Sequence, residues 1–295
     1  MALAIFCTDS NAQERGFLGH GRIFVNDFLG DGYDRWRTGS AGSSWVWGRG
    51  WDNQLPEQFG DILEFRLGGE IISPRNINSS GAGDRPFAGI WTFGAHTHFQ
   101  RARTEFSLGG EAVAIGPMTG LDQFQKALHD LLGLPGPSDS VLAAQLPNQW
   151  HLRGVAEMGR DFSLSSRSRL RPFAEVRAGD ETLVRAGFDL TFGNFGQGEL
   201  LVRDWVTGHR YRVVENQQAG VSFVVGGDVA KVYDSVYLPG DRGLEPSDTR
   251  SRARAGIHWR NDKSHVFYGL TWLSKEYVGQ SDGQVVGAVR FDLHF

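Results

Sequence analysis

Residues 284–295 read QVVGAVRFDLHF and alternate between apolar and polar side chains. One side of this two-residue repeat carries Val285, Gly287, Val289, Phe291, Leu293 and Phe295, and the other side carries Gln284, Arg290, Asp292 and His294. Successive side chains of a β-strand point to opposite faces, so the stretch predicts a strand with one apolar and one polar face. A soluble β-sandwich contains strands of the same kind, and one strand alone leaves both architectures open.

The same alternation returns along the chain, with charged residues on the polar side. Ala253, Ala255, Ile257 and Trp259 alternate with Arg252, Arg254, His258 and Arg260, and comparable segments lie near residues 63–70, 150–158, 182–191 and 268–275. In a soluble protein such polar faces would usually be rich in Lys, whereas here Arg, Glu, Asp and His dominate. Apolar residues toward lipid that alternate with polar residues toward a lumen are typical of a transmembrane barrel. Closure also pairs every backbone group, which a bilayer requires.

The predicted fold is all-β, a transmembrane antiparallel β-barrel of about 12 strands with a short helix in an extracellular loop. The expected strands cover 20–28, 36–48, 60–73, 87–99, 102–115, 148–162, 165–178, 181–194, 219–234, 249–260, 263–277 and 283–295. We expect residues 1–295 to form a single domain. The segment 195–218 fits no strand clearly, although its Leu200-Leu201 and Val213-Val214 pairs could extend neighbouring strands.

Tryptophans give a second indication of a membrane barrel. Eight tryptophans lie mostly near the ends of expected strands: Trp36, Trp45, Trp47, Trp51, Trp91, Trp205, Trp259 and Trp272. Such rings suit the two membrane interfaces, and ordinary core packing is the alternative interpretation.

Composition excludes several other classes. The 30 basic and 34 acidic residues are scattered, so nucleic-acid binding is not indicated. Cys7 is the only cysteine, which excludes an internal disulfide. No apolar run approaches the roughly 20 residues of a membrane-spanning helix. Because the first residues lack a basic signal-peptide region, we expect the sequence to begin near the mature N-terminus. Phe6 beside Cys7 argues against a lipoprotein anchor there.

Alternate connections between the expected strands should lie at the outer surface. These connections are 29–35, 74–86, 116–147, 235–248 and 278–282. Within 116–147, apolar residues with Gln125 and His129 recur at helical spacing between Thr119 and Gly133, which predicts a short amphipathic helix. A helix in a long loop needs a surface to pack on, so we expect it to lie against the barrel rim.

Several polar residues should meet near that rim. They are Asn26, Asp27, Asp31, Asp34, Thr38, Asp84, Arg85 and His129. Carboxylate and amide oxygens suit a hard cation such as Ca²⁺, and a histidine can act as a general base toward water. Each residue alone also fits ordinary turn or helix chemistry. No G-x-S-x-G motif is present, which leaves Ser43 and Ser44 as weak candidates for a nucleophile.

Four ordered motifs carry a resemblance to a known family. They are VNDF (25–28), DRWRTG (34–39), DRPFAG (84–89), and Gly116-Pro117 followed by Gln125 and His129. In order and spacing these motifs resemble the lipid A 3-O-deacylase family over about the first half of the chain. The second half resembles it mainly in strand pattern and in the terminal Phe295.

The resemblance implies a twelve-stranded barrel in the bacterial outer membrane that hydrolyses the ester-linked 3-position acyl chain of lipid A with Ca²⁺. It places the catalytic histidine at His129, the Asn-Asp pair at Asn26 and Asp27, and the threonine at Thr38. Asp27 would be a metal ligand, and Asn26 and Thr38 would orient water or substrate. The family also uses a positively charged side chain that no lysine here matches, so we expect Arg85 to meet the developing negative charge or a lipid phosphate.

Two other functions stay open from the sequence. A small porin or structural barrel would conduct ions or have no activity, and would not depend on a metal. An outer-membrane phospholipase would differ only in the lipid that it cleaves. The expected partner is lipid A or lipopolysaccharide.

Overall fold

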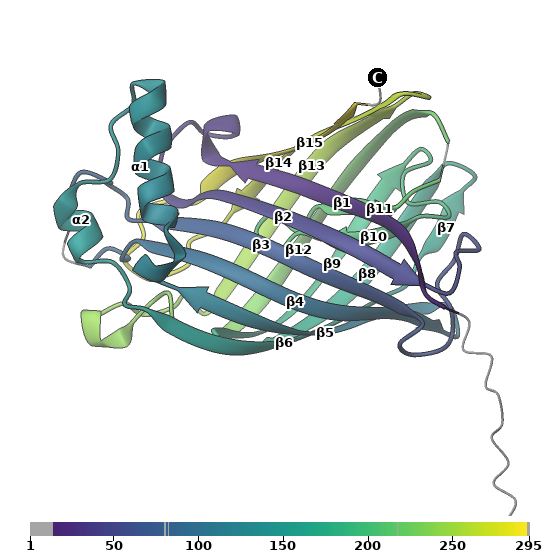
Figure 1. The fold of residues 1–295 in the computed structure, drawn as a ribbon, viewed down its shortest axis with the longest axis horizontal. Helices are drawn as coiled ribbons and strands as arrows, with labels where there is room; N and C mark the ends of the chain where they lie inside the picture. Colours follow the sequence, from purple (N-terminus) through teal and green to yellow (C-terminus); the bar gives the residue numbers. More distant parts are fainter. Residues whose placement is uncertain (1–13, 80, 82, 217, 294–295) are drawn as a thin grey trace, which may run out of the picture.

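The computed structural model describes residues 14–293 except 80, 82 and 217, and it is an elongated β-barrel (Figure 1). The barrel strands are β1 (Gly16–Asn26), β2 (Trp36–Gly48), β3 (Ile62–Ser73), β4 (Ala88–Arg101), β5 (Thr104–Ile115), β6 (Gln149–Gly159), β8 (Ser168–Ala178), β9 (Glu181–Phe192), β12 (Gly220–Ser235), β13 (Thr249–Arg260), β14 (Ser264–Leu273) and β15 (Gln284–Leu293). Cys7 and Phe295, which entered the sequence interpretation, lie outside the described residues.

All of these strands pair antiparallel with their neighbours, and two pairings close the ring. β1 pairs with β15, where Asn26 lies opposite Gly287, and β6 pairs with β8. The short strand β7 (Phe162–Ser165) pairs with β8 beyond the end of β6 and so continues β6, which leaves twelve strands of the 13-stranded sheet to form the barrel. The predicted strands 36–48 and 249–260 coincide with β2 and β13. The predicted transmembrane barrel is confirmed.

The two faces of the wall differ as the alternation predicted. Leu152 and Trp150 on β6 point outward, with exposed fractions of 84% and 64%. Glu64 on β3 and Arg290 on β15 point inward and are buried. The apolar side chains therefore face lipid, and the charged side chains pair within the lumen.

Within the segment 195–218, residues 200–214 do not extend neighbouring strands; they form a separate hairpin inside the barrel. Its strands are β10 (Leu200–Arg203) and β11 (Arg210–Val214), which pair only with each other. The Trp205 indole donates to Glu70 of the wall at 2.8 Å, and the Tyr211 hydroxyl lies 2.8 Å from that of Ser44. A Cβ atom at Gly21 would collide with the carbonyl oxygen of Arg212, so the wall needs glycine where the hairpin approaches.

This hairpin also corrects the predicted tryptophan girdle. Trp205 lies in the lumen, and Trp36 is only 1% exposed, so neither belongs to an interface belt. Trp259 and Trp272 are 43% and 46% exposed on the outer wall, as the girdle requires.

The loops at one end carry the helices (Figure 1). The predicted loop helix is confirmed as α1 (Leu121–Leu132), preceded by the 3-10 turn η2 (Pro117–Thr119), and a second helix, α2 (Asp139–Ala143), follows it. Of the residues that the structure describes, none belongs to a helix long and apolar enough to span a membrane.

Helix α1 packs on the outside of the wall rather than over the lumen. Leu121 packs against Ile71, whose neighbour Glu70 points inward, so Ile71 lies on the outer face. The indole of Trp91 donates to the carbonyl oxygen of Thr119 at 3.0 Å. A Cβ atom at Gly89 would lie 2.5 Å from Thr119 Oγ1, so the glycine of the DRPFAG motif makes room for the start of the helix.

Candidate active site

The end of β1 builds the first part of the site. The Asn26 side chain accepts a hydrogen bond from the backbone N–H of Phe28 at 2.8 Å and thereby caps the 3-10 turn η1 (Asp27–Leu29). The buried carboxylate of Asp27 accepts from the backbone N–H of Arg35 at 3.0 Å. The two neighbouring polar residues therefore fix the loop that leads from β1 to β2.

Asp34 joins that loop to β2 and to helix α1. Its Oδ1 atom accepts from the Thr38 hydroxyl at 2.5 Å and from the Gln125 amide at 3.2 Å. Its Oδ2 atom lies 3.2 Å from Nε2 of His129. Gln125 and His129 are four residues apart and so lie on one face of α1, which faces the barrel. Thr38 and His129, both expected from the sequence, are brought together through a carboxylate.

The chain that follows helix α1 also contacts the His129 ring. Its Nδ1 atom lies 2.7 Å from the carbonyl oxygen of Pro135, and its side chain is 12% exposed. Gly133 ends the helix in the left-handed conformation, with φ +68°, and turns the chain back so that this carbonyl can reach the ring.

Asp27 has the electrostatic environment of a cation ligand. Burial raises the pKa of its carboxyl, the hydrogen bond from the backbone N–H of Arg35 lowers it, and nearby Asp34 and Asp31 raise it, so that the pKa is about 8. Within the described part of the chain, no basic side chain forms an ion pair with Asp27. A buried carboxylate near two other acids favours either a proton or a cation, so these residues fit a bound Ca²⁺.

Arg85 lies in a different set of contacts. It is 1% exposed, and its guanidinium forms an ion pair with Glu276 in the loop after β14. Glu276 also pairs with Arg37 at 2.6 Å, and Arg37 pairs with Glu70 at 2.6 Å. Arg85 therefore belongs to the charged network of the lumen, and among the described residues it forms no hydrogen bond or ion pair with Asp34 or His129.

The serines that the sequence left open also lie away from this site. The hydroxyl of Ser44 is fully buried in the lumen, where it donates to Glu64 at 2.5 Å. Ser43 lies within β2 on the other face of the strand, and it pairs with Leu67 of β3. Neither belongs to the group around Asp34.

From the sequence, Asp34 was expected only as one of the carboxylates near the rim, and Gln125 only as a residue of the loop helix; a contact of either with His129 was not predicted. A signal was present, because Asp34 and Thr38 are four residues apart within one motif and Gln125 stands one helical turn before His129. The contact between the two motifs joins residues 91 positions apart, which no local pattern predicts.

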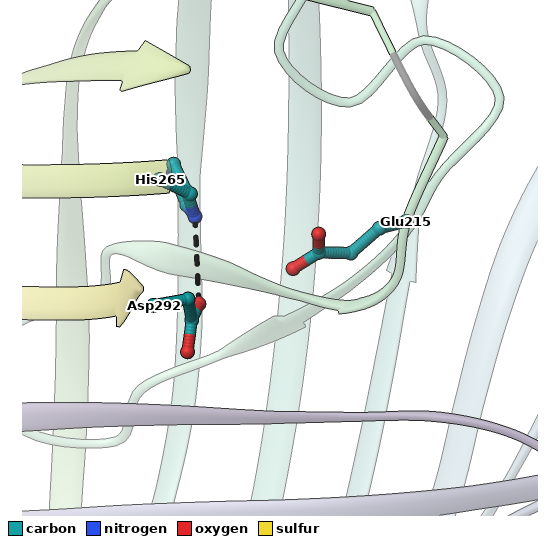
Figure 2. A group of neighbouring side chains, drawn as sticks. All are labelled: Glu215, His265 and Asp292. Atoms are coloured by element: carbon teal, nitrogen blue, oxygen red, sulfur yellow. Dashed lines mark ion pairs between the residues drawn. The ribbon is translucent and has the colours of Figure 1, made fainter. Parts of the chain in front are cut away.

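A second group of possible metal ligands lies at the opposite end of the barrel. Figure 2 shows Glu215, His265 and Asp292, whose ligand atoms lie within 4.8 Å of one another. Arg290 pairs with both carboxylates, at 2.5 Å from Glu215, and Nη1 of Arg212 lies 2.6 Å from Nε2 of His265. Arginines already neutralise these acids, so a cation would meet net repulsion, and we do not treat the group as a metal centre.

Comparisons with known proteins agree with this fold. A sequence model of the family described as "Outer membrane protein LpxR" matches residues 23–295. No curated protein sequence matches the chain significantly. The solved structure of LpxR from Salmonella typhimurium is similar with a TM-score of 0.75 and 16% identity, over 94% of this chain and 100% of that chain. The β domain of the Bordetella autotransporter BrkA has a TM-score of 0.49 and 9% identity, over 94% and 99%.

At 16% identity the Salmonella structure is evidence for the fold alone, and the BrkA match carries no argument. The family match is different, because it covers most of the chain, and it confirms the resemblance drawn from the sequence motifs. It also confirms the expected location in the bacterial outer membrane. This barrel belongs to the LpxR family of outer-membrane proteins.

Proposed function

We propose that this protein hydrolyses the ester-linked acyl chain at the 3-position of lipid A, with a dependence on Ca²⁺. The observation that carries the proposal is the position of the Asp34 group, with Thr38 and His129, between the outer rim of the wall and helix α1. A site on the outside of the wall can meet a lipid of the outer leaflet without extracting it. Family membership supports the same substrate class.

Helix α1 offers a surface for acyl chains beside that site. Phe124, Leu128 and Leu131 are exposed by 58%, 39% and 82%, and their spacing places them on one side of the helix. We call this set the apolar ridge. An exposed apolar ridge of this kind is unfavourable in water, whereas acyl chains would cover it.

The residues of the site have distinct roles in this reaction. His129 takes a proton from a water molecule while the water oxygen bonds to the acyl carbonyl carbon. The ester C–O bond then breaks, and the proton passes from His129 to the sugar oxygen that leaves. The products are a free fatty acid and a 3-hydroxyl group. Asn26 and Thr38 orient the water or the ester within this group.

Asp27 is the residue that would hold Ca²⁺. When bound, the ion would supply positive charge that polarises the acyl carbonyl. Arg85 is too deeply buried to contact a lipid, so its role is to join the segment just before β4 to the loop after β14 through Glu276. The support for Ca²⁺ is the family resemblance together with the buried carboxylate of Asp27, which forms no ion pair within the described part of the chain.

Lipid analysis of the purified protein tests the proposal. The wild-type protein in detergent is incubated with lipid A or with phospholipids, with Ca²⁺ or with a chelator, and the products are measured by mass spectrometry. We expect loss of the 3-linked acyl chain from lipid A only when Ca²⁺ is present. Cleavage of phospholipid alone would indicate a phospholipase, and no cleavage together with ion conductance would indicate a porin.

A variant of the proposed base sharpens the test. His129→Ala should lower kcat by at least about 100-fold, because general base catalysis is typically worth that much. His20→Ala is the matched control, since His20 is an exposed histidine on β1 far along the wall. Full activity of His129→Ala in a folded barrel would remove His129 from the mechanism.

A further inference from the structure

The geometry points to Asp34 as the positioning residue of His129, with Nε2 as the nitrogen that takes the proton and the Pro135 carbonyl as the group that fixes the tautomer. This inference rests on the proposed function, because it specifies how the proposed base works. It adds two groups, a carboxylate and a backbone carbonyl, to the residues that the sequence motifs indicated.

The first step concerns the proton on the ring. A carbonyl oxygen can only accept a hydrogen bond, so the contact of 2.7 Å between Nδ1 and the Pro135 oxygen requires a hydrogen on Nδ1. In the neutral ring the lone pair is then on Nε2. The turn that begins at Gly133 holds the carbonyl in place, and the N–H of Leu134 donates back to the His129 carbonyl at 2.9 Å.

The second step concerns the carboxylate. Asp34 uses Oδ1 for Thr38 and Gln125. Its buried Oδ2 has no hydrogen-bond partner among the described residues, although Nε2 is only 3.2 Å away. The lone pair of Nε2 is therefore not engaged by the carboxylate and can accept from a water molecule. Once Nε2 holds the proton, a charged ring stands beside a charged carboxylate.

That arrangement favours the transition state over the ground state. Positive charge develops on His129 only as the water loses its proton, and Asp34 attracts that charge where little water screens it. Before the proton moves, the neutral ring gains little from the carboxylate. Asp34 should therefore act mainly on kcat and much less on KM.

The variant Asp34→Asn tests this role with little change in shape. The amide oxygen can still accept from Thr38 and Gln125, but the negative charge beside Nε2 is lost. We expect kcat to fall about 100-fold with KM changed less than about twofold. Asp130→Asn is the matched control, because it removes the same charge from the exposed residue next to His129; it should retain full activity.

A second measurement reads the tautomer without relying on turnover. In ¹⁵N-histidine-labelled protein, the ring signals absent from His129→Ala belong to His129, and the neutral ring should carry its hydrogen on Nδ1. A hydrogen on Nε2 would overturn the inference. So would unchanged kcat in Asp34→Asn while His129→Ala is inactive, and that result would leave the proposed function intact. An inactive wild type would instead contradict the proposed function. The NMR signals would still show which nitrogen of His129 carries the hydrogen.

Discussion

Glu276 is surrounded by arginines at the end of the barrel that carries α1. Nε of Arg37 lies 2.6 Å from its carboxylate, Nη1 of Arg250 lies at 3.7 Å, and Arg85 forms a third ion pair. Burial alone would raise the pKa of this carboxyl, but Arg37, Arg85 and Arg250 outweigh burial and lower it to about 2. Glu276 thus holds three cations from three parts of the chain.

The lowered pKa predicts how stability depends on pH. Because the folded-state pKa lies below the ordinary value of 4.5, the stabilisation is complete above about pH 4.5 and is lost as pH falls toward 2. The loss amounts to about 3 kcal/mol at most for this one group. Glu276→Gln should lower the unfolding midpoint at neutral pH and reduce its further fall between pH 5 and 2, measured by urea unfolding in detergent. Parallel acid curves for both proteins would contradict this account.

Individual site residues could be predicted from the sequence only in part. The motifs supplied Asn26, Asp27, Thr38 and His129, and the structure joins Thr38 to His129 through Asp34. Arg85 was expected beside them because DRPFAG ends an outer loop. Its guanidinium instead points into the lumen, where Glu276 attracts it. Which way a side chain points at a strand end depends on such tertiary partners.

Elements with a two-sided pattern were predicted most accurately. β2 and β13 begin and end at the expected residues, because lipid on one side and ion pairs on the other enforce the alternation. The hairpin of β10 and β11 has no such contrast. Leu200, Val202 and Val213 are all buried against the lumen side of the wall. The hairpin therefore has no face toward lipid, and its sequence lacks the pattern that marks the wall strands.

The docking of α1 on the wall makes a prediction at the level of elements. At Gly89 a Cβ atom would lie 2.5 Å from Thr119 Oγ1 and 2.9 Å from Leu121 Cβ, at the start of the helix. Gly89→Val should displace α1, separate His129 from Asp34 and lower deacylation at least about tenfold in a barrel that still folds. The measurement is lipid A turnover together with heat-modifiable gel mobility as a check of folding.

A glycine in open space provides the control for that variant. At Gly110 on β5, a Cβ atom would have no non-neighbouring atom of the described residues within 4 Å. Gly110→Val should therefore keep its activity. Equal activities of the two variants would mean that the activity does not depend on the close approach of α1 to Gly89.

The barrel as a whole has a filled interior. The β10–β11 hairpin occupies the lumen, and a cavity of about 220 Å³ remains between the hairpin, with Arg203 and Arg210, and the wall, with Arg66 and Arg153. Ion pairs around Glu276 cross the lumen nearer the α1 end. Such an interior suits a scaffold that presents a site on its outer surface, rather than a pore.

This interior predicts that the protein does not conduct ions. The wild type in planar bilayers should give no stable single-channel current. A variant in which residues 199–214 are replaced by a short Gly-Ser turn should give discrete openings, because the hairpin that fills the lumen is gone. Steady porin-like conductance of the wild type would show that the hairpin does not seal the barrel.

The central claim is that the reaction takes place outside the wall, between the rim of β1 and β2 and helix α1. Photo-crosslinking locates the substrate directly. Lipid A with a photoactivatable group on its 3-linked acyl chain is bound to His129→Ala, which prevents turnover, and the adducts are mapped by peptide mass spectrometry. We predict adducts on the apolar ridge of α1 that unlabelled lipid A suppresses. Adducts on the β10–β11 hairpin, or adducts that unlabelled lipid A does not suppress, would contradict the claim.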